Sequence, residues 1–393
     1  PVAKIDTVGR KMYFYGFGRE KGIDPYYYIL YEAQLDRPNV LRKLTAENAS
    51  HDVHISPSGR YMVDSYSTVS REPVNVVGNR KGKVIMTLEK PDLRPVYDLG
   101  WKAPERFKVK AADGVTDLYG VMWKPADFDS TKVYPIISNV YPGPFYEYVP
   151  TRFTINDDYN TRLAQLGFIV ITVGHRGGTP IRGKAYHTYG YGKQRDYPLA
   201  DDKYAIEQLA TRYPFIDGTK VGIYGHSGGG FMSASAICTY PEFYSAAVSS
   251  AGNHDNRIYN KGWVEIHFGV KEKVKTVKDS LGVEHTTYEY SVETRPNQEL
   301  VKNYKHGLLL FTGAMDKTVN PANTLRMADA LIKAGKDFDM YVLPKSTHGF
   351  FGESEDFFEH KMWRHFARLL LHDDSAEADV DLNKNMINGD KRR

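Results

Sequence analysis

From Tyr134 onward, short apolar runs alternate with segments whose apolar residues recur at helical spacing. The apolar runs span residues 136–140, 168–173, 221–224, 246–250, 308–312 and 340–343. The helical patterns span residues 159–166, 202–212, 229–240 and 322–334, with a last helix at about 356–371. Buried strands separated by amphipathic helices are typical of a doubly wound α/β fold. The pattern predicts a mostly parallel sheet with helices on both faces.

The first 95 residues have a different pattern. Short β-type runs at 12–15, 26–31, 52–55, 61–63, 74–77 and 83–88 are separated by turn signals, and no helical pattern interrupts them. Such spacing is typical of sandwiches and propeller blades. Two blades or fewer fit, whereas a closed propeller needs about four to eight. We therefore predict a partial propeller-like segment (1–95), an α/β domain (96–375) and a flexible polar tail (376–393).

Composition excludes several classes of protein. The 52 basic and 48 acidic residues are interspersed and give a net charge of +4, so no nucleic-acid binding is expected. The lysine-rich stretch 271–278 is expected to be a solvated loop. The single cysteine, Cys238, excludes an intrachain disulfide and a cysteine-based metal site.

The first residues of the chain indicate whether it is a fragment of a longer protein. It begins Pro1-Val2-Ala3 without an initiator methionine, and no signal peptide or membrane-spanning apolar run is visible. Its first residues have the pattern of the middle of a β structure. We expect a fragment or processed chain of a longer parent, for which a periplasmic or extracellular location is expected.

Gly225-His226-Ser227-Gly228-Gly229 matches the G-x-S-x-G pattern of a nucleophile elbow. It follows the apolar run 221–224 and precedes the helical pattern 229–240, which is the context that such an elbow requires. Ser227 would then lie at the positive end of a helix dipole. The motif predicts Ser227 as a nucleophile, and it leaves open whether His226 contacts substrate or only packs.

A serine nucleophile needs a base and a group that orients the base. In this fold class the order along the chain is Ser, then Asp or Glu, then His. Asp316 follows the apolar run 308–312, and His348 follows the run 340–343. Among 13 histidines, only His348 has this placement. We predict Asp316 as orienter and His348 as base; the alternative for Asp316 is a turn or helix-cap residue.

An oxyanion hole needs two hydrogen-bond donors. The backbone N–H of Gly228 is one candidate. The loop Val140-Tyr141-Pro142-Gly143-Pro144 is poor in N–H groups, so the Tyr141 hydroxyl is the second candidate, unless that ring only packs. Gly177-Gly178 is not followed by a P-loop lysine pattern. No metal or cofactor is expected.

These motifs resemble those of the prolyl oligopeptidase family of serine peptidases, in particular its dipeptidyl peptidase IV branch. Asn139-Val140-Tyr141-Pro142-Gly143-Pro144 is similar to that branch's D-V-Y-x-G-P loop, whose tyrosine is an oxyanion donor. Gly313-Ala314-Met315-Asp316 and Thr347-His348-Gly349 resemble its G-x-x-D and T-H-G segments. The resemblance covers about residues 10–371. It implies an α/β-hydrolase domain preceded by a propeller, with the N-terminal propeller portion of the parent as a partner.

The resemblance also implies a specificity pocket for the residue before the cut bond. Tyr259, Trp263 and Val319 match pocket positions of the family. Gly228 stands where the family usually has tyrosine, Trp263 where it has a second pocket tyrosine, and Thr318 where it often has asparagine. The family's paired glutamates, which hold the substrate's amino terminus, belong to early propeller blades that this sequence does not include.

Three functions remain open from the sequence. The first is a serine peptidase that removes dipeptides from peptide N-termini, with proline, alanine or another apolar residue at the penultimate position. The second is a carboxylesterase that uses the same triad. The third is a non-catalytic fragment that acts as a binding module through exposed strand edges. A homodimer is possible in each case.

Overall fold

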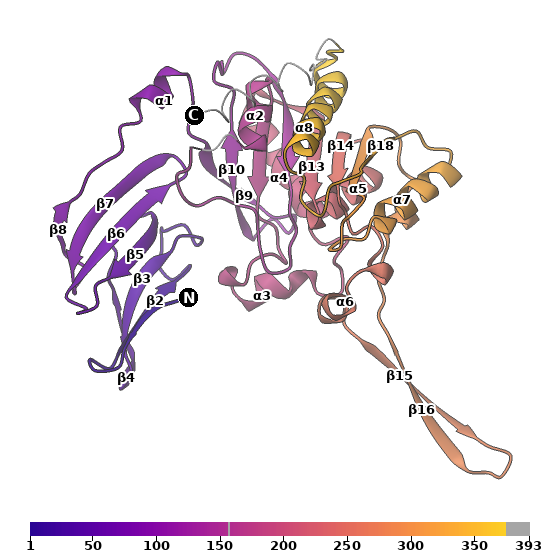
Figure 1. Cartoon of the computed structure of the whole chain (residues 1–393), viewed down its shortest axis with the longest axis horizontal. Coiled ribbons are helices and arrows are strands. Elements are labelled where there is room, and N and C mark those ends of the chain that lie inside the picture. Colours follow the sequence, from indigo (N-terminus) through magenta and orange to yellow (C-terminus); the bar gives the residue numbers. More distant parts are fainter. Residues whose placement is uncertain (156–157, 375–393) are drawn as a thin grey trace.

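The computed structural model describes residues 1–155 and 158–374. Two small β-sheets from the N-terminal part lie beside a larger sheet that is flanked by helices (Figure 1). The predicted flexible tail, 376–393, lies outside the described residues. In the part of the chain that is described, no helix is both long and apolar enough to cross a membrane.

The N-terminal segment consists of two antiparallel meanders of four strands each. The first contains β1 (Val2–Asp6), β2 (Lys11–Gly16), β3 (Ile29–Gln34) and β4 (Arg37–Lys43). The second contains β5 (Ser50–Ile55), β6 (Tyr61–Thr68), β7 (Arg71–Asn79) and β8 (Val84–Thr87), and the short helix α1 (Arg94–Asp98) follows. The two sheets share a small core of Tyr13, Leu30, Leu44, Val53 and Met62. Four-stranded sheets are the unit of a propeller blade, as predicted.

The larger sheet has eight strands in the order β18-β17-β14-β13-β11-β12-β10-β9. Its bounds are β9 (Glu105–Lys110), β10 (Asp117–Trp123), β11 (Tyr134–Asn139), β12 (Ile169–Val173), β13 (Ile216–His226), β14 (Tyr244–Ser250), β17 (Leu308–Gly313) and β18 (Asp339–Leu343). Six strands of this sheet are mutually parallel, namely β11, β12, β13, β14, β17 and β18. At one edge, β10 pairs antiparallel with β12, and β9 pairs antiparallel with β10. This confirms the predicted mostly parallel sheet.

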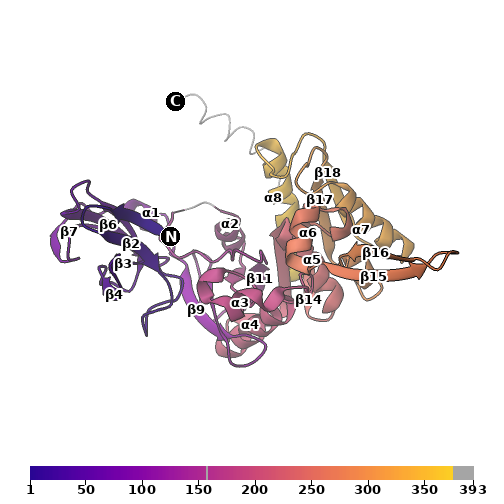
Figure 2. The ribbon, with the colours of Figure 1, turned by 90° about the horizontal axis from the view of Figure 1, so that it is seen from below.

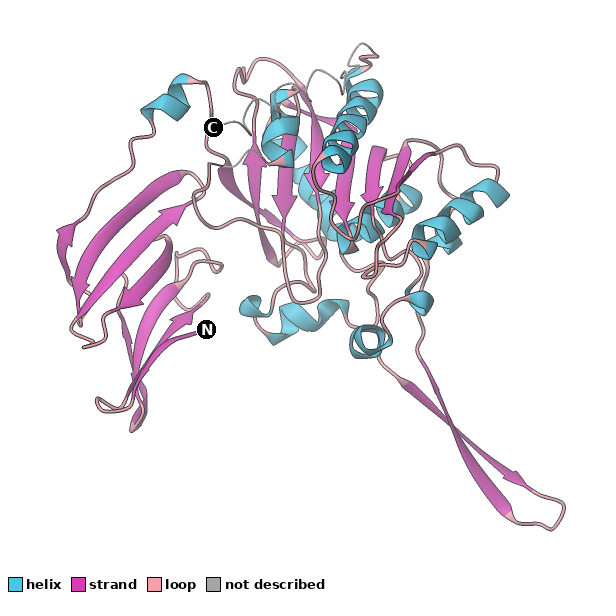
Figure 3. Cartoon of the chain, viewed as in Figure 1, coloured by secondary structure: helices cyan, strands magenta, loops and turns pink. Residues whose placement is uncertain are grey.

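Helices cover both faces of this sheet (Figure 3). The helices of this domain are α2 (Tyr159–Gln165), α3 (Lys184–His187), α4 (Leu199–Arg212), α5 (Gly228–Thr239), α6 (Lys261–Phe268), α7 (Ala322–Lys333) and α8 (Glu353–Phe366). Those that pack on the sheet faces are α2, α4, α5, α7 and α8. Leu308 and Leu310 pack with α4, α5 and α7, whereas Leu309 and Phe311 pack with α2 and α8. Successive residues of a strand point to opposite faces of the sheet, so a strand made entirely of apolar residues must be covered by other elements on both faces.

The stretch 271–278 is not a loop, and that prediction was wrong. It forms β15 (Lys271–Lys278), which pairs with β16 (Glu284–Ser291) in a hairpin that projects away from the rest of the molecule (Figure 2). Every residue of both strands is exposed, so neither strand shows the alternation of apolar and polar residues that reveals a half-buried strand. Cross-strand ion pairs such as Lys275–Glu289, 2.8 Å apart, support the pairing instead.

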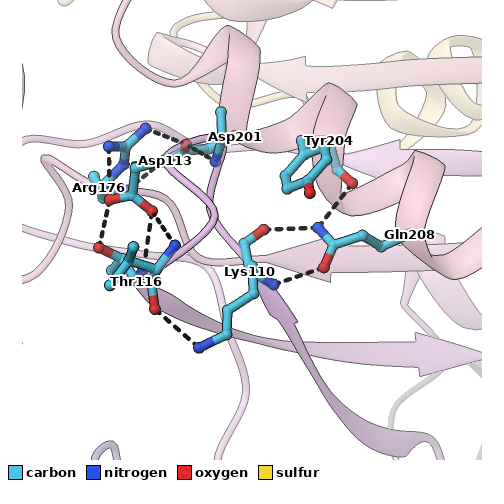
Figure 4. Close-up of polar contacts among 9 residues, drawn as sticks. Lys110, Asp113, Thr116, Arg176, Asp201, Tyr204 and Gln208 are labelled. Carbon is cyan, nitrogen blue, oxygen red and sulfur yellow. Dashed lines mark hydrogen bonds and ion pairs between the residues drawn. The ribbon is translucent and has the colours of Figure 1, made fainter.

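The edge hairpin β9–β10 is fastened to α4 by polar contacts (Figure 4). Asp201, in the first turn of α4, is fully buried and accepts bonds from the guanidinium of Arg176 at 2.7 and 3.0 Å. Arg176 also donates to Asp113 in the hairpin turn, at 3.0 Å. Further along α4, Gln208 bonds both the N–H and the C=O of Lys110. These contacts keep the antiparallel edge in register with the parallel sheet.

The N-terminal sheets contact the α/β domain through buried polar groups. Arg106 on β9 forms a two-pronged ion pair with Asp24, at 2.7 and 3.1 Å. The Tyr26 hydroxyl donates to the buried carboxylate of Glu147, which lies in the loop after β11. Tyr26 therefore belongs to a turn that faces the α/β domain, which is why the predicted strand 26–31 begins only at Ile29. The domain boundaries themselves remain predictions.

Candidate active site

Ser227 lies in a strained turn between β13 and α5. Its backbone has φ 57° and ψ −119°, a conformation that non-glycine residues rarely adopt. A Cβ at Gly225 or Gly229 would lie 2.4 or 2.0 Å from the carbonyl oxygen of Val140. Only glycine fits at these two positions, and the turn presents Ser227 at the head of α5. This is the geometry expected of a nucleophile elbow.

Asp316 and His348 meet across two loops at the carboxyl edge of the sheet. His348 Nδ1 lies 2.8 Å from Asp316 Oδ2. The other carboxylate oxygen, Oδ1, accepts the N–H groups of Thr318 and Val319 at 2.8 and 2.9 Å. The Asp316 side chain is fully buried, whereas the His348 side chain is 27% exposed. An ionised Asp316 requires a proton on Nδ1, so Nε2 of His348 is the nitrogen that can act as a base.

Close backbone packing brings these two loops together. A Cβ at Gly313 would lie 2.3 Å from the carbonyl oxygen of Thr347, so glycine is required there. The N–H of Met315 donates to the carbonyl oxygen of Ser346 at 3.0 Å. The loops follow the neighbouring parallel strands β17 and β18, which end at the same edge of the sheet. The pairing of Asp316 with His348 therefore follows from strand order.

His226 packs against His348, with the ring centroids 4.7 Å apart. Its Nδ1 lies 2.8 Å from the Ser250 hydroxyl at the end of β14. Burial, and after it a positive charge on His348, lowers the pKa of His226 to about 4, so the ring is neutral at pH 7. Because His226 precedes Ser227, this contact places His348 directly at the elbow. The sequence left packing and substrate contact open for His226, and packing on the base is one of its roles.

Ser227 and Gly228 open into a small cavity of about 140 Å³. Tyr141 lines it together with Tyr259 and Trp263, whose rings meet edge to face 5.4 Å apart. The structure thus brings the predicted oxyanion groups and two predicted pocket residues to one place. Val319 does not line this cavity; its side chain is buried and its N–H donates to Asp316.

The cavity also has lining residues that sequence reasoning missed. They are Phe145, Gln194, Phe231 and Asn253. Asn253 comes three residues after β14 and so lies at the carboxyl edge of the sheet, which was the one available signal. Gln194 comes from the loop before α4, and no motif marks it.

Two further histidines lie outside this site. His175 and His254 are buried, and His254 Nδ1 lies 3.0 Å from the side-chain amide of Asn297. Burial lowers the pKa of His254 to about 3, consistent with a structural role. Within residues 1–155 and 158–374, no group of three or more His, Cys, Asp or Glu side chains is placed to hold a metal ion.

With this geometry established, comparison with known proteins identifies the family. The model of the prolyl oligopeptidase family matches residues 156–372, which is more than half of the chain. The chain belongs to the prolyl oligopeptidase family. A second model, that of the dipeptidyl peptidase IV N-terminal region, matches residues 2–73. The two matches correspond to the α/β domain and to the propeller-like segment.

Two relatives support this assignment. Dipeptidyl peptidase 8 of Homo sapiens is 27% identical over 356 residues, which cover 88% of this chain and 37% of that protein. A probable dipeptidyl-aminopeptidase B of Aspergillus oryzae is 28% identical over 337 residues, covering 84% and 35%. The chain thus spans little more than a third of the length of these relatives.

Two solved structures share the fold. A putative dipeptidyl aminopeptidase IV from Bacteroides ovatus superposes with a TM-score of 0.76 at 24% identity, over 94% of this chain and 50% of that one. Porphyromonas gingivalis dipeptidyl peptidase 4 gives a TM-score of 0.76 at 21% identity, over 94% and 49%. The predicted combination of propeller strands and α/β-hydrolase domain is confirmed.

Proposed function

We propose that this chain is the catalytic part of a serine peptidase that removes dipeptides from the N-termini of peptides. The observation that carries the proposal is the meeting of the Asp316–His348 pair with the Ser227 elbow beside a small, partly aromatic cavity. The relatives named as dipeptidyl peptidases support the same substrate class. A small cavity beside the nucleophile suits a single side chain of the acyl group rather than several residues of a polymer.

In the acylation step, His348 Nε2 takes the proton from the Ser227 hydroxyl as the Ser227 oxygen attacks the carbonyl carbon of the substrate's penultimate residue. Asp316 keeps the proton of His348 on Nδ1 and stabilises the imidazolium that forms. The tetrahedral oxyanion meets the N–H of Gly228 and the hydroxyl of Tyr141. His348 then gives its proton to the departing amine, and the dipeptide stays on Ser227 as an ester.

Deacylation repeats this chemistry with water. His348 takes a proton from water as the water oxygen attacks the ester carbonyl, and then returns a proton to Ser227 Oγ as the dipeptide leaves. The neutral His226 ring shields one side of His348 without competing for its proton, because burial keeps the pKa of His226 low. Every proton transfer in this scheme therefore passes through His348.

Replacing Tyr141 with phenylalanine tests the oxyanion role. Tyr141→Phe removes one hydroxyl and little volume, so we expect kcat to fall by about 10²–10³-fold, or about 2.7–4 kcal/mol, with KM little changed. Steady-state kinetics on a dipeptide-amide provides the measurement. A variant whose kcat stays within about twofold of the parent would show that the ring only packs.

The penultimate residue of the substrate is expected in the cavity beside Gly228. Trp263 and Tyr259 supply flat apolar walls, and no side chain extends from position 228. We propose acceptance of proline and alanine, together with larger apolar residues. Discrimination among these should be modest, since one methylene in such a pocket changes the free energy of the transition state by about 1–3 kcal/mol.

Gly228→Tyr is expected to narrow this preference toward proline. A Cβ at position 228 meets no atom within 4 Å, so the backbone there has room for the first atom of a side chain beside the cavity. The test is a panel of dipeptide-amides varied at the penultimate residue, with kcat/KM measured for the parent and for Gly228→Tyr. Absolute proline specificity in the parent would contradict the open pocket.

The same panel separates the competing functions when short acyl esters are included. Rapid cleavage of esters without cleavage of amides would favour a carboxylesterase. No turnover of either class by the intact protein would favour a binding module. Cleavage of dipeptide-amides with a free amino terminus, and not of N-acetylated ones, is the result expected of the proposed function.

A further inference from the structure

The loop that follows β11 carries a buried carboxylate that the reaction scheme does not use. Glu147 lies in the same loop as Tyr141, and it is only 6% exposed. Its Oε1 accepts the hydroxyl of Tyr186 at 2.6 Å and the N–H of His175 at 3.3 Å, and its Oε2 accepts the hydroxyl of Tyr26. Burial of a carboxylate is costly unless hydrogen bonds replace its water. The position of Glu147 is therefore determined by these three donors.

The backbone around Glu147 is shaped to admit the carboxylate. A Cβ at Gly178 would lie 2.2 Å from Oε1 of Glu147. A Cβ at Gly174 would lie 2.8 Å from the hydroxyl oxygen of Tyr26. Gly178 belongs to the pair Gly177-Gly178, which matches no phosphate-binding loop. Its role in this structure is to let the backbone approach the carboxylate closely.

Contacts lead from Glu147 to Tyr141. Tyr146, the neighbour of Glu147 in the chain, packs against Tyr141 with the ring centroids 6.2 Å apart. The residue after Tyr141 is also held, because the hydroxyl of Tyr197 donates to the carbonyl oxygen of Pro142 at 2.9 Å. The loop is thus anchored at both ends, and the ring of Tyr141 lies between the two anchors.

One of the three donors to Glu147 belongs to the propeller-like segment. Tyr26 is 4% exposed, and its hydroxyl lies 3.3 Å from the guanidinium of Arg182. Burial, and after it the negative charge of Glu147, raises the pKa of Tyr26, so the hydroxyl keeps its proton and remains a donor. The guanidinium of Arg106, on β9, lies over the Tyr26 ring at 5.3 Å. Tyr26 is therefore fixed against the α/β domain by both its ring and its hydroxyl.

We propose that Glu147 is a positioning residue for the oxyanion hole, through which Tyr26 of the propeller-like segment holds the Tyr141 hydroxyl where the oxyanion forms. The inference rests on the proposed oxyanion role of Tyr141, and it adds a dependence on a part of the chain outside the α/β domain. A catalytic group displaced by about 1 Å can lower the rate by about 10²-fold. Loss of one bond to Glu147 should therefore lower kcat.

Tyr26→Phe provides the first test, because it removes the hydroxyl and keeps the ring. The bonds from Tyr186 and His175 to the carboxylate remain, so the fold is retained. We expect kcat for a fluorogenic dipeptide-amide to fall by about tenfold, with KM little changed, because the oxyanion loses an aligned donor. Tyr186→Phe removes the other hydroxyl without touching the contact between the domains, and it should have a similar effect.

A double-mutant cycle shows whether the loss passes through Tyr141. Once Tyr141→Phe has removed the hydroxyl that Glu147 positions, adding Tyr26→Phe should change kcat by less than about twofold. A merely structural role of Tyr26 would instead give the same loss of about tenfold with and without the Tyr141 hydroxyl. The melting temperature of each variant is measured alongside kcat.

A second tyrosine on a buried carboxylate provides the matched control. Tyr244 donates to the buried side chain of Asp202 at 2.7 Å. It lies at the amino end of β14, whereas the active site lies at the carboxyl ends of the strands. Tyr244→Phe loses the same kind of bond, so it should lower the melting temperature and keep the kcat of the parent.

The outcomes separate this inference from the proposed function. Equal losses in both backgrounds, or a loss below about twofold in Tyr26→Phe or Tyr186→Phe, would overturn the positioning role and leave the peptidase function standing. A Tyr141→Phe enzyme with the kcat of the parent would overturn the oxyanion role of Tyr141 and this inference with it. A loss of kcat that disappears in the Tyr141→Phe background is the result expected of the proposal.

Discussion

Ser227→Ala is expected to lower kcat by about a million-fold and to abolish labelling by a fluorophosphonate probe. The reason is that Ser227 alone occupies the strained turn at the head of α5, beside His348 and both proposed oxyanion donors. Alanine differs from serine only by the hydroxyl, so the turn and its bond from the N–H of residue 227 to the carbonyl oxygen of Ser250 remain. Probe labelling and turnover of a dipeptide-amide give the two measurements.

A serine in the same helix provides the matched control. Ser235 is buried on α5, and within residues 1–155 and 158–374 its hydroxyl bonds only the carbonyl oxygen of Met232, at 3.0 Å. Ser235→Ala should keep full labelling. If the Ser227→Ala protein were labelled as strongly as the parent, the nucleophile would have to be another residue.

Asp316→Asn is expected to lower kcat by about 10⁴-fold while the fold is retained. The amide oxygen of asparagine can still accept the N–H groups of Thr318 and Val319, which hold the loop. Its NH₂ group, however, would donate to His348 Nδ1 and so place the imidazole proton on Nε2. Nε2 could then no longer take the proton of Ser227.

Kinetics and thermal unfolding together check this prediction. The melting temperature of Asp316→Asn should stay near that of the parent, and the loss should appear in kcat. Asp329→Asn is a suitable control, because Asp329 lies on the exposed side of α7, where its carboxylate forms an ion pair with Lys333 at 2.7 Å. A loss below about tenfold in Asp316→Asn would mean that Asp316 does not orient the base.

Much of the α/β domain was predictable because its signals are local. Fully buried parallel strands are short continuous apolar runs, and amphipathic helices repeat apolar residues every three or four positions, so both patterns appear within about ten residues. The elbow at Ser227 was predictable for the same reason, since its two glycines and its strand-to-helix setting are adjacent in the chain. The hairpin of β15 and β16 was missed because none of its residues is buried.

The propeller-like segment shows where a local signal misleads. The run of tyrosines at 26–28 has high strand propensity, but Tyr26 turns toward the α/β domain to bond Glu147, which is 121 positions away in the sequence. A long-range bond of this kind determines the local conformation, and propensity alone does not reveal it.

The sequence by itself determined most of the alternation of strands and helices in the α/β domain, the strained turn at Ser227 and the chain order of nucleophile, acid and base. Only the tertiary structure decided that Asp316 meets His348 at 2.8 Å, that His226 packs on His348, and that Tyr141 lines the cavity beside Ser227. Each strand, helix or turn that the sequence predicted is marked by residues a few positions apart, whose spacing alone specifies the periodicity or the turn. The contacts between distant residues depend on which strands become neighbours in the sheet, and that order is set by the packing of the whole domain.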